Sequence, residues 1–225
     1  MHCQCYYLAA SLPGPPGIRV FANLPQILEN TIRFEHLNKF TSFEASCYTD
    51  PLSLEHITGG LEETIKFIAN RPNSHLRCVT NFDTVTSLLS IEHNGNIRVR
   101  SSLNPDILVR RLEGGTPNIN ARITTLPKMA MPKVLGGGGY PIGIVLAPII
   151  PVPDWQIHYA KLLDDIKHSL DFDGDLTIGL ITHRFTPGSK DVLMEWYPNI
   201  SLEMNEDNRS IKRNKFGDKI FLKQG

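Results

Sequence analysis

The sequence predicts an α/β protein folded as an open or partial (β/α) barrel. Short apolar runs alternate with stretches in which apolar residues recur at helical spacing along the 225 residues. This alternation is typical of parallel βαβ units, and about five of them suit a barrel whose functional loops lie at the C-terminal strand ends. No linker divides the chain, so residues 1–225 are expected to form a single domain.

Five short runs have the composition of strands. The two most apolar runs, Ile142–Ala147 and Leu176–Ile181, are expected to be buried on both faces, as parallel strands covered by helices usually are. The predicted strands are, in order, Ser42–Cys47, Arg77–Thr80, Ile97–Ser102, Ile142–Ala147 and Leu176–Ile181.

Helical periodicity fills the intervals between these runs. Leu61, Ile65 and Ile68 share one face of a predicted helix, and Gly188–Trp196 forms another. A further helix is due within residues 124–139, but two prolines there would cost it about 3 kcal/mol each in a helix interior. We expect a broken helix or a disordered loop in that interval.

Two aspartates mark the expected starts of further helices. Asp83 is placed to cap a helix that ends near Ser90, and Asp154 is placed to cap a longer one. The apolar face of the longer helix comprises Trp155, Tyr159, Leu162, Leu163, Ile166 and Leu170.

The bulk composition excludes several classes of protein. Lys+Arg and Asp+Glu both number 23, so a nucleic-acid partner would have to use a local basic patch. No apolar run reaches the roughly 18 residues that span a bilayer, so we expect no membrane partner. Four cysteines at irregular spacing, without a secretion signal, predict reduced thiols in the cytoplasm, and Cys78 is expected to be a core residue. We expect a monomer.

Cys3 and Cys5 form a closely spaced pair at the start of the chain. Thiolates in a loop can converge on a metal ion or on an iron–sulfur cluster. Two reduced cysteines near a chain terminus show the same pattern, and no second pair completes a tetrahedral site. The spacing alone leaves both interpretations open.

Sequence blocks elsewhere narrow the choice, because they follow a single order over nearly the whole chain. They are His2-Cys3-Gln4, Tyr7-Leu8, Phe43-Glu44-Ala45-Ser46-Cys47-Tyr48-Thr49-Asp50-Pro51, His93-Asn94-Gly95, Gly139-Tyr140-Pro141-Ile142-Gly143, Ala147-Pro148-Ile149, His183-Arg184-Phe185-Thr186 and Leu202-Glu203-Met204. Together the blocks resemble the spore photoproduct lyases and their relatives in the radical S-adenosylmethionine superfamily. The resemblance implies a partial (β/α) barrel of the radical S-adenosylmethionine type. Its first strand would precede the cysteine loop and is expected to be lacking from this chain.

The resemblance also implies an activity. In the family, three thiolates of a CxxxCxxC loop hold a [4Fe-4S] cluster whose open iron chelates S-adenosylmethionine. An electron donor reduces the cluster, and one electron then cleaves the cofactor to a 5′-deoxyadenosyl radical. The radical abstracts hydrogen from a thymine dimer in damaged DNA, the spore photoproduct, which splits back into two thymines. The protein supplies positioning and excludes water.

The cysteine loop departs from the family pattern His-Cys-Gln-Tyr-Cys-Tyr-Leu. Cys5 takes the tyrosine position, Tyr6 takes the last cysteine position, and Cys3 matches the middle cluster cysteine. The first cluster cysteine is expected to lie upstream of Met1. With Cys3 and Cys5 as the metal ligands, a cluster would need an outside ligand or an unusual one such as His2. The departure predicts impaired catalysis.

Cys47 and Tyr7 match catalytic positions of the family. Cys47 corresponds to the cysteine that returns hydrogen to the product radical, and its place at the end of a predicted strand suits that role. A small buried core residue is the alternative for Cys47. Tyr7 corresponds to a tyrosine implicated in relaying the radical, and a core or surface aromatic is its alternative.

Thr49, Asn81 and Ser102 match cofactor-binding positions. The hydroxyls of Thr49 and Ser102 correspond to family hydroxyls that contact S-adenosylmethionine, although ordinary strand-end hydroxyls have the same pattern. Asn81 replaces a lysine thought to contact the cofactor carboxylate. An amide brings no charge, so cofactor binding is expected to weaken.

The segment around His183 also differs from the family. Gly179 and Thr182 replace a glutamate and a glutamine. His183 either lines the site or is a core histidine, and the sequence leaves both open.

The C-terminal stretch Arg209–Lys223 is a local basic patch with six Lys or Arg residues and one acid, Asp218. A hairpin is expected within about residues 203–225. The patch resembles the family's lesion-recognition hairpin, with Lys215 and Phe216 in place of its arginine and tyrosine. Cations and an aromatic wedge suit the extraction of a lesion from stacked DNA. A solvated basic tail is the alternative.

Three hypotheses follow from the sequence. The first is a spore photoproduct lyase-like DNA-repair protein with impaired catalysis. The second is a catalytically inactive remnant with at most weak DNA binding. The third is a radical S-adenosylmethionine enzyme with another substrate, because a barrel does not fix the chemistry that it hosts.

Overall fold

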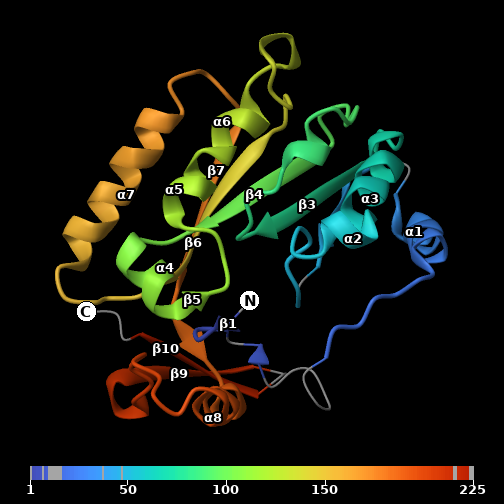
Figure 1. Ribbon diagram of the computed structural model, residues 1–225. Helices are drawn as coiled ribbons and strands as arrows, with labels where there is room; N and C mark the ends of the chain where they lie inside the picture. The colour runs from blue at the N-terminus through green and yellow to red at the C-terminus, as the bar shows by residue number, and fades with distance from the viewer. Residues whose placement is uncertain are drawn as a thin grey trace.

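Three sheets organise the part of the chain that the structure describes (Figure 1). A five-stranded parallel sheet forms the centre, and its strands point toward a three-stranded antiparallel sheet. A two-stranded ribbon of β1 (His2–Cys3) and β5 (Glu113–Gly114) lies nearby. The computed structural model describes residues 2–6, 8–9, 17–36, 38–46, 48–214 and 217–222.

The central sheet has the strand order β2-β3-β4-β6-β7, and all neighbouring strands are parallel. The order places the C-terminal ends of all five strands at one edge, which confirms the predicted partial (β/α) barrel. Each strand overlaps one predicted run, although Cys47 lies outside the described residues. The strands are β2 (Thr41–Ala45), β3 (Ser74–Thr80), β4 (Ile97–Leu103), β6 (Ile142–Ile149) and β7 (Leu176–Thr182).

Helices connect and cover these strands. Figure 1 shows α1, α2 and α3 beside the β2–β3 end of the sheet and α4 to α7 beside its other end. None of the described helices is long and apolar enough to cross a membrane. The α-helices are α1 (Leu24–Thr31), α2 (Glu55–Thr58), α3 (Gly60–Ala69), α4 (Asp106–Leu112), α5 (Ile119–Ile123), α6 (Thr125–Ala130), α7 (Trp155–Ser169) and α8 (Pro187–Trp196). The 3-10 helices are η2 (Ile32–Phe34), η3 (Thr86–Leu88), η4 (Lys133–Leu135) and η5 (Glu206–Asn208).

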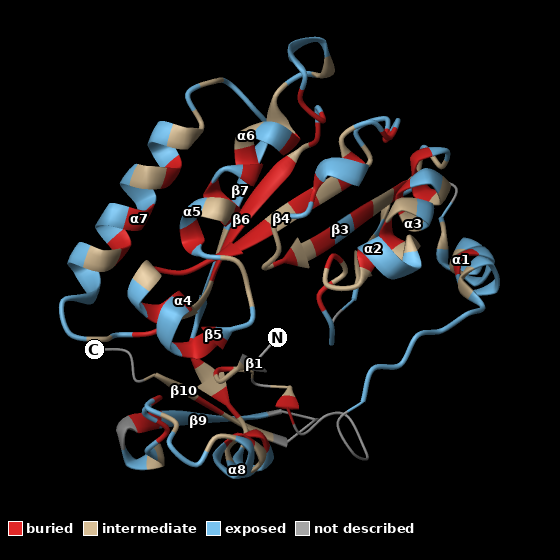
Figure 2. Cartoon of the chain, viewed as in Figure 1, coloured by how far each residue is buried: buried red, intermediate tan, exposed pale blue. Residues whose placement is uncertain are grey.

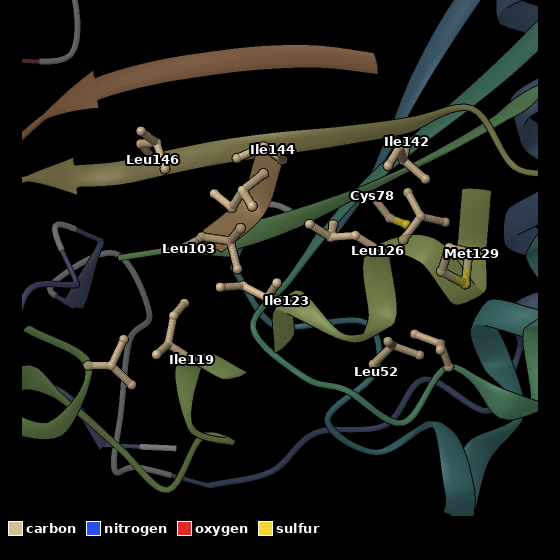
Figure 3. Close-up of a cluster of buried hydrophobic side chains, with 14 of the residues drawn as sticks. Leu52, Cys78, Leu103, Ile119, Ile123, Leu126, Met129, Ile142, Ile144 and Leu146 are labelled. Carbon is tan, nitrogen blue, oxygen red and sulfur yellow. The ribbon is translucent and has the colours of Figure 1, made fainter. Parts of the chain in front are cut away.

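One part of the hydrophobic core lies between the sheet and the helices α5 and α6 (Figure 3). Side chains of β4 and β6 face the apolar sides of both helices, so burial of apolar surface holds the layers together. Cys78 of β3 is fully buried in this core, as predicted, and burial raises the pKa of its thiol to about 12. The residues at the interface include Leu103, Ile119, Ile123, Leu126, Met129, Ile142, Ile144 and Leu146.

Three helix predictions are confirmed. Helix α3 buries Leu61, Ile65 and Ile68 on one face. Helix α8 covers the predicted range and begins at a capping box of Thr186 and Ser189. The interval 124–139 holds a broken helix, because α6 ends before Pro132 and only the short η4 follows.

The helix predicted from Asp83 to about Ser90 is wrong. Only the single 3-10 turn η3 forms there, and its N-terminal flank is Val85. Thr84, Val85 and Thr86 form a β-branched run that disfavours an α-helix. Val85 and Leu88 instead anchor the turn in the core.

Helix α7 begins where predicted, but not by the predicted cap. The side chain of Asp154 makes no capping hydrogen bond, and its backbone lies in the left-handed region with φ 56°. The predicted apolar face is partly solvent-exposed, because Trp155 is 39% and Leu163 46% exposed.

The prediction that the last strand is buried on both faces is wrong. β7 is an edge strand, and its Ile178 and Leu180 are 56% and 66% exposed. Figure 2 shows β6 as largely buried, in contrast to β7. Helix α7 packs on α4 and α5. The apolar side chains of β7 are therefore not covered on both faces of the strand.

The small antiparallel sheet has the order β8-β10-β9, with β8 (Arg184–Phe185), β10 (Gly217–Leu222) and β9 (Arg209–Asn214). The predicted C-terminal hairpin is therefore confirmed as the pair β9–β10. Lys215 and Phe216, which come between the two strands in the sequence, lie outside the described residues.

Candidate functional site

A cavity of about 270 Å³ opens at the C-terminal edge of the parallel sheet. Ligands of open α/β sheets bind at this edge, because the loops that follow the strands converge there. Residues of the cysteine loop, β5 and β8 line the same cavity. Each strand contributes a residue near or just after its end, namely Ser46, Asn81, Ser102, Ala147 and Thr182.

All five of the predicted site residues that the structure describes meet at this cavity. It is lined by the side chains of Cys3, Cys5, Thr49, Asn81 and Ser102. The other predicted residues, Tyr7, Cys47, Lys215 and Phe216, lie outside the described residues. The structure thus brings together segments distant in sequence, whereas the roles of these residues stay predictions.

The cysteine loop is held by β-pairing on one side and by a tyrosine on the other. β1 pairs antiparallel with β5, which sets Cys3 opposite Glu113. The hydroxyl of Tyr6 donates a hydrogen bond of 2.8 Å to the carbonyl of Tyr48, in the loop after β2. These contacts place the two cysteines beside the strand ends.

The thiols of Cys3 and Cys5 lie 3.4 Å apart and share a hydrogen bond. This bond and burial raise the pKa of Cys5 well above its usual value. The same bond lowers the pKa of Cys3, against the effect of burial. Of the two thiols, Cys3 therefore loses its proton more readily than Cys5.

The described residues do not complete the donor set of a [4Fe-4S] cluster. Such clusters are held by thiolates from several cysteines, and Cys3 and Cys5 supply two. Within the described residues, no group of three or more His, Cys, Asp or Glu side chains is arranged to hold a metal ion. The side chain of His2, the unusual ligand considered from the sequence, lies outside that set.

A buried ion pair lies against the cavity. Nη1 of Arg122 lies 2.7 Å from Oε2 of Glu113, and their side chains are 1% and 6% exposed. The same Nη1 donates to Oδ1 of Asn81 at 3.1 Å and to the carbonyl of Ser102 at 3.2 Å. One guanidinium therefore joins the strand that holds the cysteine loop to two predicted cofactor-binding residues.

The hydrogen bond from Arg122 also fixes the amide of Asn81. Because Oδ1 accepts from the guanidinium, the Nδ2 group is the part of the amide left to donate to a ligand. Ser46, which follows β2 and also lines the cavity, has a left-handed backbone with φ 63°, which is uncommon for a residue other than glycine. Its hydroxyl bonds to the hydroxyl of Thr49 at 2.5 Å, which orders the loop after β2.

Asp50 ties the end of β2 to the end of β3. Its carboxylate accepts hydrogen bonds from the Thr80 hydroxyl at 2.7 Å and from the Asn81 N–H at 2.6 Å. Burial raises the pKa of Asp50 despite these bonds. The carboxylate thus holds the backbone of Asn81 while Arg122 holds its side chain.

Asp50, Glu113 and Arg122 belong to the site, although none of them was predicted as a site residue. One signal was available for Arg122, which continues the apolar stripe of Ile119 and Ile123 on a helix face. A charged residue on such a stripe is buried only when it has a partner. Nothing in the local sequence identifies Glu113 as that partner.

His183 behaves as a core residue. It is 1% exposed, it does not line the cavity, and its ring lies 5.8 Å from that of Phe185. Burial lowers its pKa to about 4, and Arg209 acts in the same direction. Its neighbour Thr182 lines the cavity, whereas Gly179 lies within β7 and does not.

A curled parallel sheet with a cavity at its C-terminal edge and a cysteine loop beside it define a half-barrel of the radical S-adenosylmethionine type. The model of the family described as spore photoproduct lyase matches residues 1–224. The chain belongs to the spore photoproduct lyase family.

Two curated relatives named spore photoproduct lyase illustrate the similarity. The protein of Bacillus subtilis (strain 168) is 34% identical over 227 residues, which cover 99% of this chain and 65% of that protein. The protein of Geobacillus sp. (strain Y412MC61) is 35% identical over 220 residues, covering 96% of this chain and 63% of that one. The chain thus spans a little under two thirds of the length of these relatives.

Solved structures agree in fold over almost the whole chain. A double mutant of spore photoproduct lyase with bound AdoMet and dinucleoside spore photoproduct aligns with a TM-score of 0.89 and 32% identity. The alignment covers 98% of this chain and 65% of that one. A spore photoproduct lyase complexed with dinucleoside spore photoproduct aligns with a TM-score of 0.88 and 32% identity, covering 99% and 65%.

Proposed function

We propose that this chain forms the half-barrel of a DNA-repair lyase that acts on the spore photoproduct, a thymine dimer, with S-adenosylmethionine as its cofactor. One observation carries the proposal: Thr49, Asn81 and Ser102 converge with the cysteine loop on one cavity. Relatives with the same fold have been solved with AdoMet and with the dinucleoside photoproduct.

The residues around the cavity suit the polar end of S-adenosylmethionine. The Nδ2 group of Asn81 can donate to the cofactor carboxylate, and Thr49 and Ser102 offer hydroxyls. When bound and reduced by one electron, this cofactor supplies a carbon radical that abstracts hydrogen from the substrate. The protein's part is to hold both molecules and to exclude water.

Cys47 is proposed as the hydrogen donor to the product radical. Its chain neighbours Ser46 and Tyr48 both line the cavity, which supports a thiol near the substrate. Arg184 lines the cavity from β8 and supplies a cation on the side where DNA would approach. Lys215 and Phe216 are proposed to contact the lesion from the hairpin.

We further propose that residues 1–225 act as one monomeric domain with a separate electron donor.

The cysteine loop limits this function. Cys3 and Cys5 do not complete a cluster site among the described residues, so we assign no step to a cluster held by these residues alone. The same observation favours a second candidate, a protein that binds damaged DNA without catalysing repair. The two candidates differ in whether the chain cleaves S-adenosylmethionine.

Anaerobic reconstitution with iron and sulfide distinguishes them, followed by assays of S-adenosylmethionine cleavage and thymine release from photoproduct DNA. The double variant Cys5→Tyr/Tyr6→Cys restores the order of the family motif and serves as the matched comparison. We expect little iron and slow cleavage in the natural chain, and more of both in the double variant. Failure of both proteins to bind S-adenosylmethionine or the dinucleoside photoproduct would refute the proposed function.

A further inference from the structure

A second and larger cavity lies beside the site. It has a volume of about 710 Å³ and is lined by residues of β6, β7, the start of α7 and the β9–β10 hairpin. Thr182, the last residue of β7, lines both this cavity and the site cavity. The two cavities are therefore adjacent, and a polymeric ligand can extend from one into the other.

One face of the small antiparallel sheet forms a wall of this cavity. Ser210 and Phe221 are opposite each other across β9 and β10, and alternation along β9 puts Lys212 on the same face. Phe221 also pairs with Arg184 of β8, which lines the site cavity. The face therefore runs from Arg184 across two strand spacings, or about 10 Å, to Ser210, and Lys212 lies two residues further along β9.

Trp155, at the start of α7, contributes an aromatic ring to the same cavity. Its side chain is 39% exposed, although the sequence pattern placed it on an apolar helix face. The indole meets the ring of buried Tyr159 edge-on, with centroids 6.2 Å apart and an interplanar angle of 72°. The hydroxyl of Tyr159 accepts a hydrogen bond of 3.1 Å from the N–H of Ile150. This bond fixes the ring of Tyr159, on which the indole rests.

The lining has the chemistry of a site for single-stranded nucleic acid. Trp155 and Phe221 offer surfaces on which bases stack, and the exposed Lys212 offers a charge for phosphate. None of the described residues that line the cavity is acidic. The remaining lining is largely apolar and lacks the convergent polar groups that would select one small molecule.

We propose that this second cavity, the flanking groove, binds a nucleotide adjacent to the lesion in the same DNA strand. Its base lies against Trp155 and Phe221, and its phosphate lies near Lys212. The identity of the strand rests on the proposed function. Stacking and phosphate contacts tolerate any base, so the flanking groove adds affinity for DNA without reading its sequence. It also holds the strand so that the lesion meets the site cavity.

Intrinsic fluorescence tests the stacking contact directly. The chain has two tryptophans, Trp155 and Trp196, so Trp196→Phe leaves Trp155 as the sole indole. Titration of this variant with undamaged single-stranded oligothymidine should quench its emission saturably. The reciprocal variant Trp155→Phe retains the exposed Trp196 of α8 and should show little quenching. Equal quenching in both variants, or none in Trp196→Phe, overturns the proposal.

Binding measurements test the two contacts separately. Trp155→Ala should weaken oligothymidine binding roughly tenfold. Lys212→Ala should reduce the slope of log affinity against log salt by about 0.7. Trp196→Ala and Lys167→Ala, which alter exposed residues that do not line the groove, are the matched controls and should change neither quantity. Because Lys212 is exposed, its substitution keeps the test valid even where Trp155→Ala impairs folding.

The dinucleoside spore photoproduct separates the flanking groove from the proposed function, because it has no flanking nucleotide. Unchanged dinucleoside binding, with weaker oligonucleotide binding in Trp155→Ala and Lys212→Ala, supports both. Absent dinucleoside binding, with oligonucleotide binding still dependent on both residues, refutes the function and leaves the flanking groove. The flanking groove is refuted if oligonucleotide binding is unchanged in both Trp155→Ala and Lys212→Ala. It is also refuted if both variants lose dinucleoside binding.

Discussion

Arg122 and Glu113 form an ion pair of 2.7 Å that is almost fully buried beside the candidate site. Glu113 belongs to the strand that pairs with Cys3, and Arg122 donates to Asn81 and to the Ser102 carbonyl. The pair therefore links the cysteine loop to the ends of β3 and β4. A buried charge pair of this kind is costly to break, because either partner alone is left without compensation.

Arg122→Met should destabilise the protein by about 3–5 kcal/mol, since it leaves the Glu113 carboxylate buried and unpaired. Urea unfolding followed by circular dichroism measures this difference. Arg110→Met is the matched control, because Arg110 pairs with Asp106 at the surface and its side chain is 78% exposed. The control should change stability by less than about 1 kcal/mol. Equal effects of the two substitutions would contradict the role given to the buried pair.

His183 should make the fold sensitive to mild acid. Its pKa is lowered from 6.5 to about 4 in the folded protein, so the unfolded chain binds the proton more readily. Its contribution to stability is therefore complete above pH 6.5 and is lost as the pH falls toward 4. The loss should reach about 2 kcal/mol by pH 5.

His183→Gln tests this prediction, because glutamine does not titrate. The difference in unfolding free energy between pH 7.5 and pH 5 should shrink in this variant relative to the natural chain. His56→Gln alters an exposed histidine and should leave that difference unchanged. An identical pH dependence in all three proteins would show that His183 is not the acid-sensitive group.

Asn81→Lys should tighten the binding of S-adenosylmethionine. A lysine ammonium adds a charge-assisted hydrogen bond to the cofactor carboxylate, worth roughly tenfold in affinity. The neighbouring Arg122 limits the gain, although Glu113 already offsets its charge. Asn81→Asp has nearly the same size and should weaken binding. Calorimetric dissociation constants that are the same for all three proteins would count against the placement of Asn81 at the cofactor carboxylate.

Cys47→Ala should uncouple cofactor use from repair in protein that turns over. Without the thiol, the product radical finds no hydrogen donor, so S-adenosylmethionine is still consumed while misrouted products accumulate. Cys78→Ala is the control, because Cys78 is a core thiol. Chromatography of the products from photoproduct DNA measures the ratio of thymine to misrouted products. A normal yield of thymine from Cys47→Ala would refute the donor role.

Local apolar patterns predicted the parallel strands, whereas Thr49, Asn81 and Ser102 were expected at one site because they match cofactor-binding positions of the family. Strand-end residues meet whenever parallel strands are neighbours, as the order β2-β3-β4 requires. The apolar run of β7 was misleading because composition does not reveal whether a strand lies at the edge or in the centre of a sheet. Ile178 and Leu180 are apolar residues typical of a core, but they are exposed because β7 lies at the edge of the sheet.

Long-range partners were the other part that the sequence did not reveal. Arg122 meets Asn81 across 41 positions of the chain, and no spacing rule predicts that contact. Asp83 looked like a helix cap, but the β-branched residues after it stop an α-helix from forming. Trp155 fitted an apolar helix face by period, yet the structure leaves its ring on the wall of the flanking groove.

The decisive measurement is a crystal structure of the chain with S-adenosylmethionine and the dinucleoside spore photoproduct. We expect the cofactor in the site cavity, with its carboxylate against Asn81 and polar contacts to Thr49 and Ser102. We also expect the dinucleoside at the same strand ends, on the side of Arg184. Electron density for either molecule at another place, with the site cavity filled by water alone, would contradict this expectation.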